Sequence, residues 1–506
     1  MDHDEGGRQS EDRQDSAEEP RTAPAGITAS AVKGFGWQVA SFGGNRVIVF
    51  LSTLALARLL IPRDFGVFAA ALTFAQYLEV LLDFGIGSYL VYDQERGVTD
   101  RLHVAFTLNL ILTAVLATIT VVASPLLADL FGAPHRSAVF AAMAGYLVLR
   151  GLSQVNEALI QRDLLFKKLV FIELLGSGVR AGLSVGLALD GTGVWAIVTG
   201  FLAGQAVTTV AAYAVVRYRP RLRISWQAGK TMLAFGVSSV ALDILGELAL
   251  NGDYLVVGGR LGATALGVYT MAYRLPELLI NNLFWMFSKV AFPIYARSRS
   301  AGLEVLKRAM LRALKFTSVY GFAAGVGMAV SAPDIVAVIF GPQWQAAVAP
   351  MVLVSLAAAI ASTTFASGPL YPALGQPGRL VRVNIPLTIS RMVGFIVAAP
   401  YGLVWVAAVH LATNAVNAFV RLGIANRVAG TTATATFRAL IPALSVGLGV
   451  ALFTVPLAAV LPTGLVGLVI LVAAGVSGAV VAVAVSERAM FGEIRHLLRV
   501  LATMAE

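Results

Sequence analysis

Long apolar stretches fill this chain from about residue 33 to residue 486, and each is roughly 20 residues or more in length. A helix needs about 20 apolar residues to cross the hydrocarbon core of a bilayer. Of the 506 residues, 58% are hydrophobic and only 13% are charged, whereas soluble proteins carry about 25% charged residues. The sequence therefore predicts an all-α polytopic membrane protein with about fourteen transmembrane helices.

The expected spans follow one another with short connections, which leaves no room for a large soluble catalytic domain. Their approximate bounds are 34–59, 66–90, 102–130, 137–160, 168–190, 193–216, 231–258, 264–290, 309–332, 345–370, 380–400, 402–426, 437–460 and 463–486. The chain has no cysteine and five scattered histidines, and it carries no Gly-rich phosphate loop, nucleophile elbow or metal-ligand spacing. We therefore expect a membrane transporter rather than an enzyme, with no bound cofactor.

The basic residues indicate how the chain is oriented. With a cytoplasmic N-terminus, the cytoplasmic connections and the C-terminal end carry 21 Lys and Arg, and the outer connections carry 4. This asymmetry follows the positive-inside rule and predicts that both termini lie in the cytoplasm. It also explains the net charge of +10 without nucleic-acid binding. Residues 1–30 form a polar, acidic segment that we expect to be a disordered cytoplasmic tail, not a cleaved signal peptide.

An internal repeat divides the expected spans into two halves. The segment Arg58–Phe68 recurs as Arg260–Tyr269, and Ser124–Gly132 recurs as Ser331–Gly341. Arg180, followed by Gly193-Val194-Trp195-Ala196, recurs as Arg391, followed by Leu403-Val404-Trp405-Val406. Six spans in each half give both halves the same orientation, as in transporters whose lobes rock around a central site. We expect an N-lobe over 31–230, a C-lobe over 231–430, two further helices over 431–486, and an amphipathic cytoplasmic tail over 487–506.

Charged residues near the middle of spans are the candidates for function. Each costs at least about 2.5 kcal/mol at the bilayer centre, so each is expected to pair with another charge or to line an aqueous cavity. The basic ones are all arginine, whose planar fork fits two phosphate oxygens: Arg46, Arg180, Arg274 and Arg391. We predict that they line a cavity for an anionic substrate. The alternative is salt bridging, of Arg46 with Glu79 or Asp83, and of Arg274 with Glu277 or Asp243.

Other polar groups inside the spans leave two roles open. Asp243, Glu247 and Asp253 are candidates for binding a coupling Na⁺ or H⁺, although a structural role is the alternative. His410 is interpreted as a helix-packing residue rather than a proton relay. Asparagines inside spans can contact sugar hydroxyls or hold helices together, and these are Asn251, Asn281, Asn282, Asn384, Asn414 and Asn417.

Several motifs resemble those of bacterial oligosaccharide/polysaccharide flippases of the multidrug/oligosaccharidyl-lipid/polysaccharide exporter superfamily. The resemblance covers roughly residues 33–430 and is carried by Leu56–Gly66, Asp83–Gly87, Asn251–Gly258, Leu261–Tyr269, Ala272–Arg274, Phe292–Pro293 and Gly341–Trp344. It implies a V-shaped fold of two six-helix lobes with pseudo-two-fold symmetry, plus two extra C-terminal helices. It also implies translocation of an undecaprenyl-pyrophosphate-linked oligosaccharide for cell-surface polysaccharide biosynthesis, by alternating access through a cationic central cavity.

The resemblance implies a lipid-linked oligosaccharide and membrane lipids as partners, with polysaccharide polymerase or other biosynthesis machinery as further ones, and no nucleic acid. An ion-coupled multidrug exporter of the same superfamily is the alternative, which the excess of buried arginine disfavours. A membrane polymerase or ligase would need a long polar outer loop, and the outer connections are short. A non-transporting scaffold would have no use for nine charges in its spans.

Overall fold

The computed structural model describes residues 44–83, 98–163, 165–216, 219–493 and 495. Within these ranges the regular structure is helical, and no residue forms a β-strand. The acidic segment 1–30, the start of the first expected span and most of the expected tail 487–506 lie outside the described residues. The described part supports the all-α prediction.

The helices follow one another with short connections, as expected. The first occupies residues 44–59, and the others are α2 (Pro62–Asp83), α4 (Val98–Leu130), η1 (Pro134–Arg136), α5 (Ser137–Arg162), α6 (Phe166–Leu189), α7 (Val194–Val215), α8 (Trp226–Pro276), η2 (Glu277–Asn281), α9 (Asn282–Ser300), α10 (Leu303–Val330), α11 (Ala332–Ile335), η3 (Val336–Phe340), η4 (Pro342–Ala347), α12 (Val348–Phe365), α13 (Leu370–Ala373), α14 (Pro377–Ala398), η5 (Ala399–Tyr401), α15 (Leu403–Ala429), α16 (Ala433–Val460) and α17 (Leu465–Ser486).

The described residues contain 12 helices that are long and apolar enough to cross a membrane. They coincide with the expected spans from the second onward, with the seventh and eighth joined in one helix, Asp243–Asn281. The count of fourteen is not confirmed, because the first expected span begins before residue 44. Large apolar side chains on the outer helices α16 and α17 are exposed, such as Leu448, Leu452 and Val472, as lipid-facing surfaces require.

The long helix α8 is a hairpin rather than a rod. Gly262 inside it has φ 82° and ψ 173°, a left-handed conformation that glycine adopts without steric cost. The rings of Tyr254 and Tyr269 lie 5.8 Å apart, whereas a straight helix would separate the two residues by about 22 Å. The chain therefore reverses at Gly262, and the two arms of α8 correspond to the seventh and eighth expected spans.

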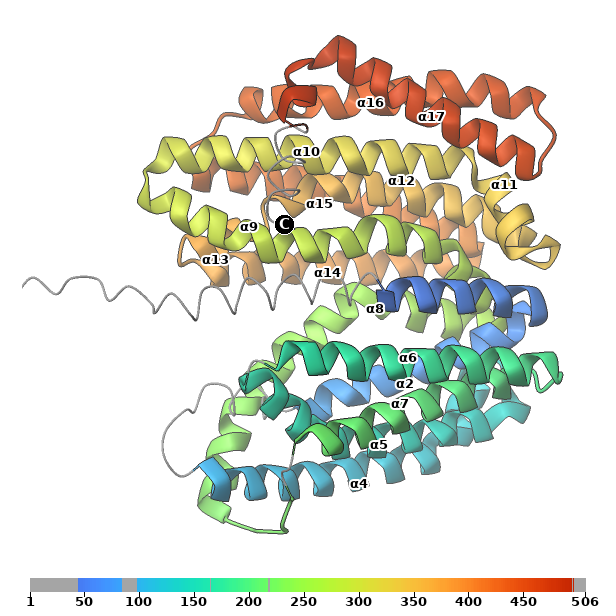
Figure 1. Ribbon diagram of the computed structural model, residues 1–506, viewed down its shortest axis with the longest axis vertical. Coiled ribbons are helices and arrows are strands. Elements are labelled where there is room, and N and C mark those ends of the chain that lie inside the picture. Colours follow the sequence, from blue (N-terminus) through green and yellow to red (C-terminus); the bar gives the residue numbers. More distant parts are fainter. Residues whose placement is uncertain (1–43, 84–97, 164, 217–218, 494, 496–506) are drawn as a thin grey trace, which may run out of the picture.

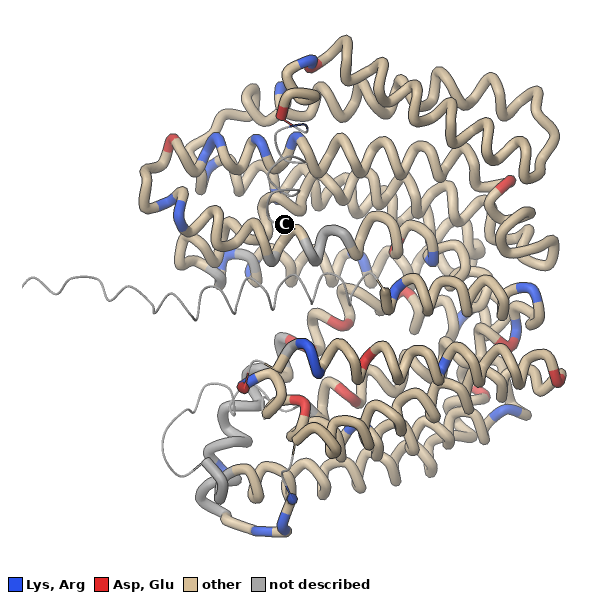
Figure 2. The backbone as a smooth tube through the Cα atoms, viewed as in Figure 1, with Lys and Arg blue, Asp and Glu red and all other residues tan. Residues whose placement is uncertain are grey.

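The helices form two layers joined by α8 (Figure 1). In one layer α4 packs on α5 and α6 packs on α7, and in the other α10 packs on both α12 and α16, with α17 on α16. The helix α2 packs extensively on α8, which also contacts α12, α14 and α15 of the second layer. Figure 2 shows Lys and Arg gathered at the end of the molecule where α9 meets α10.

Two glycines of the repeated motif bring α2 and the second arm of α8 into backbone contact. A Cβ added at Gly66 would lie 1.6 Å from the carbonyl oxygen of Ala263, and one added at Gly267 would lie 1.9 Å from that of Pro62. The contact is reciprocal, because Gly66 and Gly267 occupy the same place in the two copies of the motif. The repeat read from the sequence thus places equivalent residues face to face across a pseudo-two-fold axis.

The neighbouring helix ends exchange contacts in the same reciprocal way. The guanidinium of Arg58 donates to the carbonyls of Val338 and, at 3.3 Å, Ile339, while the indole N–H of Trp344 donates to the carbonyl of Ala57 at 2.9 Å. The matching contact joins the second half to the first: a Cβ on Gly132 would lie 3.3 Å from Gly262 Cα at the turn of α8. Each half therefore docks the end of its first helix on the second repeated segment of the other half. We call this set of contacts the glycine crossing.

Candidate functional site

A cavity of about 450 Å³ lies among α8, η2, α12, α14 and α15. All six asparagines singled out from the sequence line it: Asn251, Asn281, Asn282, Asn384, Asn414 and Asn417. Helical spacing alone could not show that side chains from five elements face one hollow. We call this hollow the asparagine cavity. An amide presents both a donor and an acceptor, as a sugar hydroxyl does, so the lining suits a polyhydroxylated ligand.

Arginines on two neighbouring helices give the asparagine cavity a positive side. Arg391 on α14 donates from Nη1 to the carbonyl of Ala249 at 3.3 Å and from Nη2 to Asn414 Oδ1 at 3.2 Å. Arg421 on α15 also lines the cavity, although it was not among the predicted site residues. Among the described residues, no carboxylate lies within 4.0 Å of either guanidinium.

Five buried polar atoms around the asparagine cavity have no hydrogen-bond partner within the described chain. They are Oη of Tyr273, Nδ2 of Asn282, Nε of Arg391, Oδ1 of Asn417 and Nε of Arg421. Folded proteins pair most of their buried polar groups, because an unpaired one costs about 1–3 kcal/mol. Five such atoms around one hollow indicate a place where a polar ligand completes the hydrogen bonding.

A second hollow of about 200 Å³ adjoins the first and contains two more of the predicted arginines. Arg180 and Arg274 line it together with apolar side chains such as Phe65, Phe68 and Leu72. Arg180 Cζ lies 4.7 Å above the ring of Phe201, and Arg274 donates to Thr53 Oγ1 at 2.8 Å. We call this the apical hollow, because Phe65 and Phe68 place it next to the glycine crossing.

The two hollows share one wall. Asn251, Tyr254 and Glu277 line both of them. Arg46 lines the asparagine cavity and, with Arg274 and Glu277, a small intervening space. Glu277 attracts Arg46 electrostatically, while Arg274 repels it. The four predicted arginines therefore line one connected region that contains a single carboxylate among its described lining residues.

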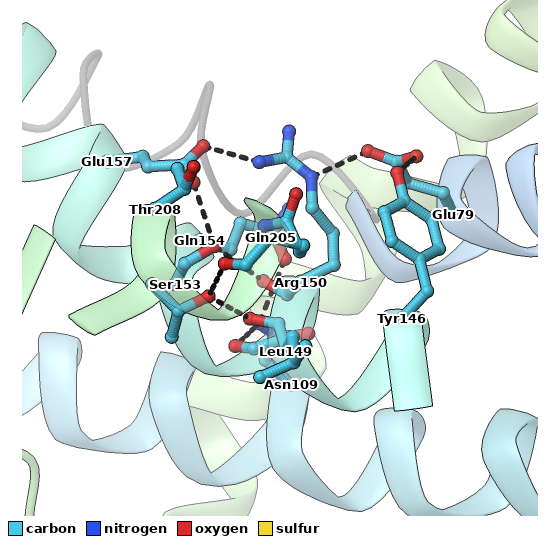
Figure 3. Close-up of polar contacts among 12 residues, drawn as sticks. Glu79, Asn109, Tyr146, Leu149, Arg150, Ser153, Gln154, Glu157, Gln205 and Thr208 are labelled. Carbon is cyan, nitrogen blue, oxygen red and sulfur yellow. Dashed lines mark hydrogen bonds and ion pairs between the residues drawn. The ribbon is translucent and has the colours of Figure 1, made fainter. Parts of the chain in front are cut away.

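The alternative drawn from the sequence paired Arg46 with Glu79 or Asp83. Glu79 instead forms its salt bridge with Arg150. Figure 3 shows Arg150 between two carboxylates, with Nε on Glu79 at 2.6 Å and Nη1 on Glu157 at 2.5 Å. Tyr146 donates to Glu79 at 2.5 Å. Arg150 was not among the predicted site residues, although a charge in an expected span was the available signal. Glu79 is thus held inside the first layer and does not neutralise Arg46.

The three candidate coupling acids lie in different surroundings. Asp243 is exposed, and Glu247 is half-buried and accepts from Asn251 Nδ2 at 2.6 Å. Asp253 is 2% exposed, and its Oδ2 meets Tyr269 Oη at 2.9 Å and His410 Nε2 at 3.0 Å. No local pattern indicated this pairing, since Asp253 and His410 are far apart in the chain. His410 also lines the asparagine cavity, so it connects the buried carboxylate to the hollow.

Comparison with known proteins gives a consistent family match. Residues 55–349 match the family model described as polysaccharide biosynthesis protein. The succinoglycan biosynthesis transport protein ExoT of Rhizobium meliloti (strain 1021) is 26% identical over 347 residues, which cover 69% of this chain and 70% of ExoT. The lipopolysaccharide biosynthesis protein WzxC of Escherichia coli (strain K12) is 27% identical over 296 residues, which cover 57% of this chain and 59% of WzxC.

Solved structures show the same fold at low sequence identity. Lipid II flippase MurJ in an inward closed conformation has a TM-score of 0.74 and 13% identity, and the match covers 90% of this chain and 99% of MurJ. An inward-facing multidrug resistance MATE transporter of the MOP superfamily has a TM-score of 0.60 and 15% identity, covering 77% of this chain and 96% of the transporter. The helices of this chain are therefore arranged as in transporters of that superfamily.

Proposed function

This chain belongs to the polysaccharide biosynthesis protein family, a group of flippase-type membrane transporters of the MOP superfamily, and on that basis we propose that it moves an undecaprenyl-pyrophosphate-linked oligosaccharide across the bacterial cytoplasmic membrane. Such a substrate combines a diphosphate, a short sugar chain and a prenyl tail. The prenyl tail would stay in lipid while the polar part passes through the protein. Movement would occur by alternating access of the two lobes.

The observation that supports this substrate most is the chemistry of the two connected hollows. The apical hollow and the intervening space offer Arg46, Arg180 and Arg274, and Glu277 is the one carboxylate among their described lining residues. Guanidinium groups bind phosphate oxygens in a bidentate manner. The asparagine cavity beside them suits sugar hydroxyls. We therefore assign the diphosphate to the three arginines and the sugars to the asparagine cavity. A cationic drug, as in the multidrug alternative, would meet an excess of positive charge.

The glycine crossing would form the gate on the outer side. It lies at the start of α2 and at the turn of α8, which the positive-inside rule assigns to the outer face. With this end shut, the hollows would be reached from the cytoplasmic leaflet, where lipid-linked sugars are assembled. Biosynthetic enzymes on that side and a polymerase on the other are the partners that such a route requires.

We assign ion coupling to Asp253 together with His410, and to H⁺ rather than Na⁺. Both carboxylate oxygens of Asp253 already accept hydrogen bonds, Oδ1 from the backbone N–H of Tyr254 at 3.0 Å and Oδ2 from the Tyr269 hydroxyl. Together with the His410 contact to Oδ2, three of the roughly four lone-pair positions of this carboxylate are in use, which leaves a single position for a sodium ion. A proton needs only the free ring nitrogen of His410. Asp243 and Glu247 are assigned no ion in this scheme.

A leaflet-access assay tests the proposal. The full chain is reconstituted into liposomes with a fluorescent undecaprenyl-pyrophosphate disaccharide, and a membrane-impermeant enzyme that modifies the sugar reports which leaflet the substrate occupies. We expect movement with the native chain and with Arg308→Ala, which removes an exposed arginine at the basic end. Arg180→Ala and Arg391→Ala should stop movement while expression and folding stay normal. A correctly folded native chain that moves no substrate would rule out the proposal.

A further inference from the structure

We infer that Tyr320 on α10 is a positioning residue for transport, because it holds a π turn that brings Glu277 and Asn282 together on the wall between the two hollows. There Asn282 donates to the substrate. This inference rests on the proposed function and deepens it, since Tyr320 is not among the described lining residues of either hollow. It follows from the winding of η2, from the unpaired amide of Asn282 and from a hydroxyl that faces lipid.

The first step concerns the winding of η2. The backbone N–H of Asn282 donates to the carbonyl of Glu277, one residue further back than in an α-helix, so Glu277–Asn281 form a π turn. Such turns are rare and occur frequently at functional sites. At about 3.6 residues per turn, an α-helix would point Glu277 and Asn282 about 140° apart. Both residues instead line the asparagine cavity and the small intervening space, so the π turn is what brings them together.

The second step concerns the amide of Asn282. The residue is 7% exposed, and its Nδ2 has no partner within the described chain. It lines the intervening space beside Arg274, which the proposed function assigns to the diphosphate, and also the asparagine cavity, which it assigns to the sugars. Asn282 therefore lies where the diphosphate meets the first sugar. An acceptor oxygen of the substrate at this place would complete the hydrogen bonding of the amide.

The third step concerns the contact that holds the π turn. Tyr320 Oη donates to the carbonyl of Leu279, inside the turn, at 2.6 Å. Leu279 and Tyr320 lie near the middle of the expected spans 264–290 and 309–332, and they are 41% and 40% exposed, so both face lipid. Lipid offers no water to a polar group, and an unbonded hydroxyl there is costly. The hydroxyl of Tyr320 is therefore best explained by its bond to the π turn.

A binding experiment separates positioning from simple support of the fold. The full chain in lipid nanodiscs is titrated with an undecaprenyl-pyrophosphate disaccharide, and the melting temperature of each variant is recorded. Asn282→Ala should weaken binding about three- to tenfold, as the loss of one hydrogen bond predicts. Tyr320→Phe should weaken binding at least about threefold, because η2 is no longer held and Asn282 leaves the wall.

The matched control is Tyr213→Phe. The hydroxyl of Tyr213 on α7 donates to the carbonyl of Leu152 on α5 at 3.1 Å, so this variant loses the same kind of bond between two helices. Tyr213 is not among the described lining residues of either hollow. We expect native affinity in Tyr213→Phe, with a change in melting temperature comparable to that of Tyr320→Phe.

Two further variants show whether Tyr320 acts through Asn282. Tyr320→Phe should add nothing to the loss in Asn282→Ala, because both changes remove the same contact. Deletion of Leu279 should keep the affinity, since it takes one residue out of the turn, and α-helical winding then places Glu277 and Asn282 about 40° apart. Tyr320→Phe in the deletion background should therefore have no effect on binding. The double variant decides if the deletion variant does not fold.

Several results would overturn the inference while leaving the proposed function intact. Native affinity in folded Tyr320→Phe or Asn282→Ala would do so, whatever the melting temperature, and so would an equal loss of affinity in Tyr213→Phe. A loss in the double variant equal to the product of the single losses would show that Tyr320 and Asn282 act independently. Lost affinity in a folded deletion variant would count in the same way. If the folded native chain does not bind the probe, the proposed function fails, and the inference with it.

Discussion

Replacing Gly66 with alanine should open the glycine crossing. The new Cβ would lie 1.6 Å from the carbonyl oxygen of Ala263, where ordinary contact begins at 3.4 Å, so α2 and α8 must separate by almost 2 Å. The clash is with backbone, which cannot rotate away as a side chain does. Overpacking of this kind costs about 1–3 kcal/mol.

The cost falls on the closed crossing alone, because a state in which the two helices have parted has room for the methyl group. A penalty of about 2 kcal/mol changes the ratio of the two states about 30-fold. A parted state populated at about 1% in the native chain would then rise to about a quarter of the molecules. Gly267→Ala should act in the same way, since its Cβ would lie 1.9 Å from the carbonyl oxygen of Pro62.

Double electron–electron resonance between two spin labels can follow this shift. The chain has no native cysteine, so only the introduced cysteines would be labelled. Spin labels at Asp190→Cys and Tyr401→Cys would report on the two layers from exposed positions beside α7 and α15. We expect a longer distance population to grow in Gly66→Ala. Gly259→Ala is the matched control on α8, because its Cβ would meet nothing within 4 Å. An unchanged distance distribution in folded Gly66→Ala would refute the reasoning.

Three further outcomes are expected. Arg150→Gln should lower the free energy of unfolding by about 3–5 kcal/mol, because it leaves the carboxylates of Glu79 and Glu157 without their shared cation. A thermal melt in detergent measures this change. A melting temperature equal to that of the native chain would contradict it. His410→Gln should abolish the dependence of substrate movement on a transmembrane pH gradient, while movement without a gradient continues in the leaflet-access assay. Trp344→Phe should keep the aromatic packing but lose the hydrogen bond to Ala57, so it should weaken the closed crossing by about 1 kcal/mol, visible as a small shift in the same spin-label distances.

The spans and the repeat could be predicted from the sequence because lipid imposes a strong local rule on every segment that crosses it. Length and apolarity placed α4 and α12 within a few residues, and the Gly66 motif indicated its partner at Gly267. The arginines were also predictable as a set, since charge in a span is rare. Their assignment to a binding site remains a prediction, and what the structure adds is that Arg46, Arg180, Arg274 and Arg391 line connected hollows.

The pairings between distant helices could not be predicted in this way. Asp253 and His410 are 157 positions apart, and nothing local distinguishes a packing histidine from one that meets a buried carboxylate. Arg421 lies near the end of the expected span 402–426, and only the packing of α14 and α15 shows that it lines a cavity. Tertiary packing decides which face of each helix meets which neighbour, and a single sequence carries little information about that choice.

The glycine crossing obeys the rule of an isologous dimer interface, in which a surface meets a copy of itself. Here both copies belong to one chain. A side chain at either Gly66 or Gly267 would meet the backbone of the other half, so a change at one position cannot be offset by a change at the other. Both halves must therefore keep glycine at this point, while segments away from the axis can lengthen independently.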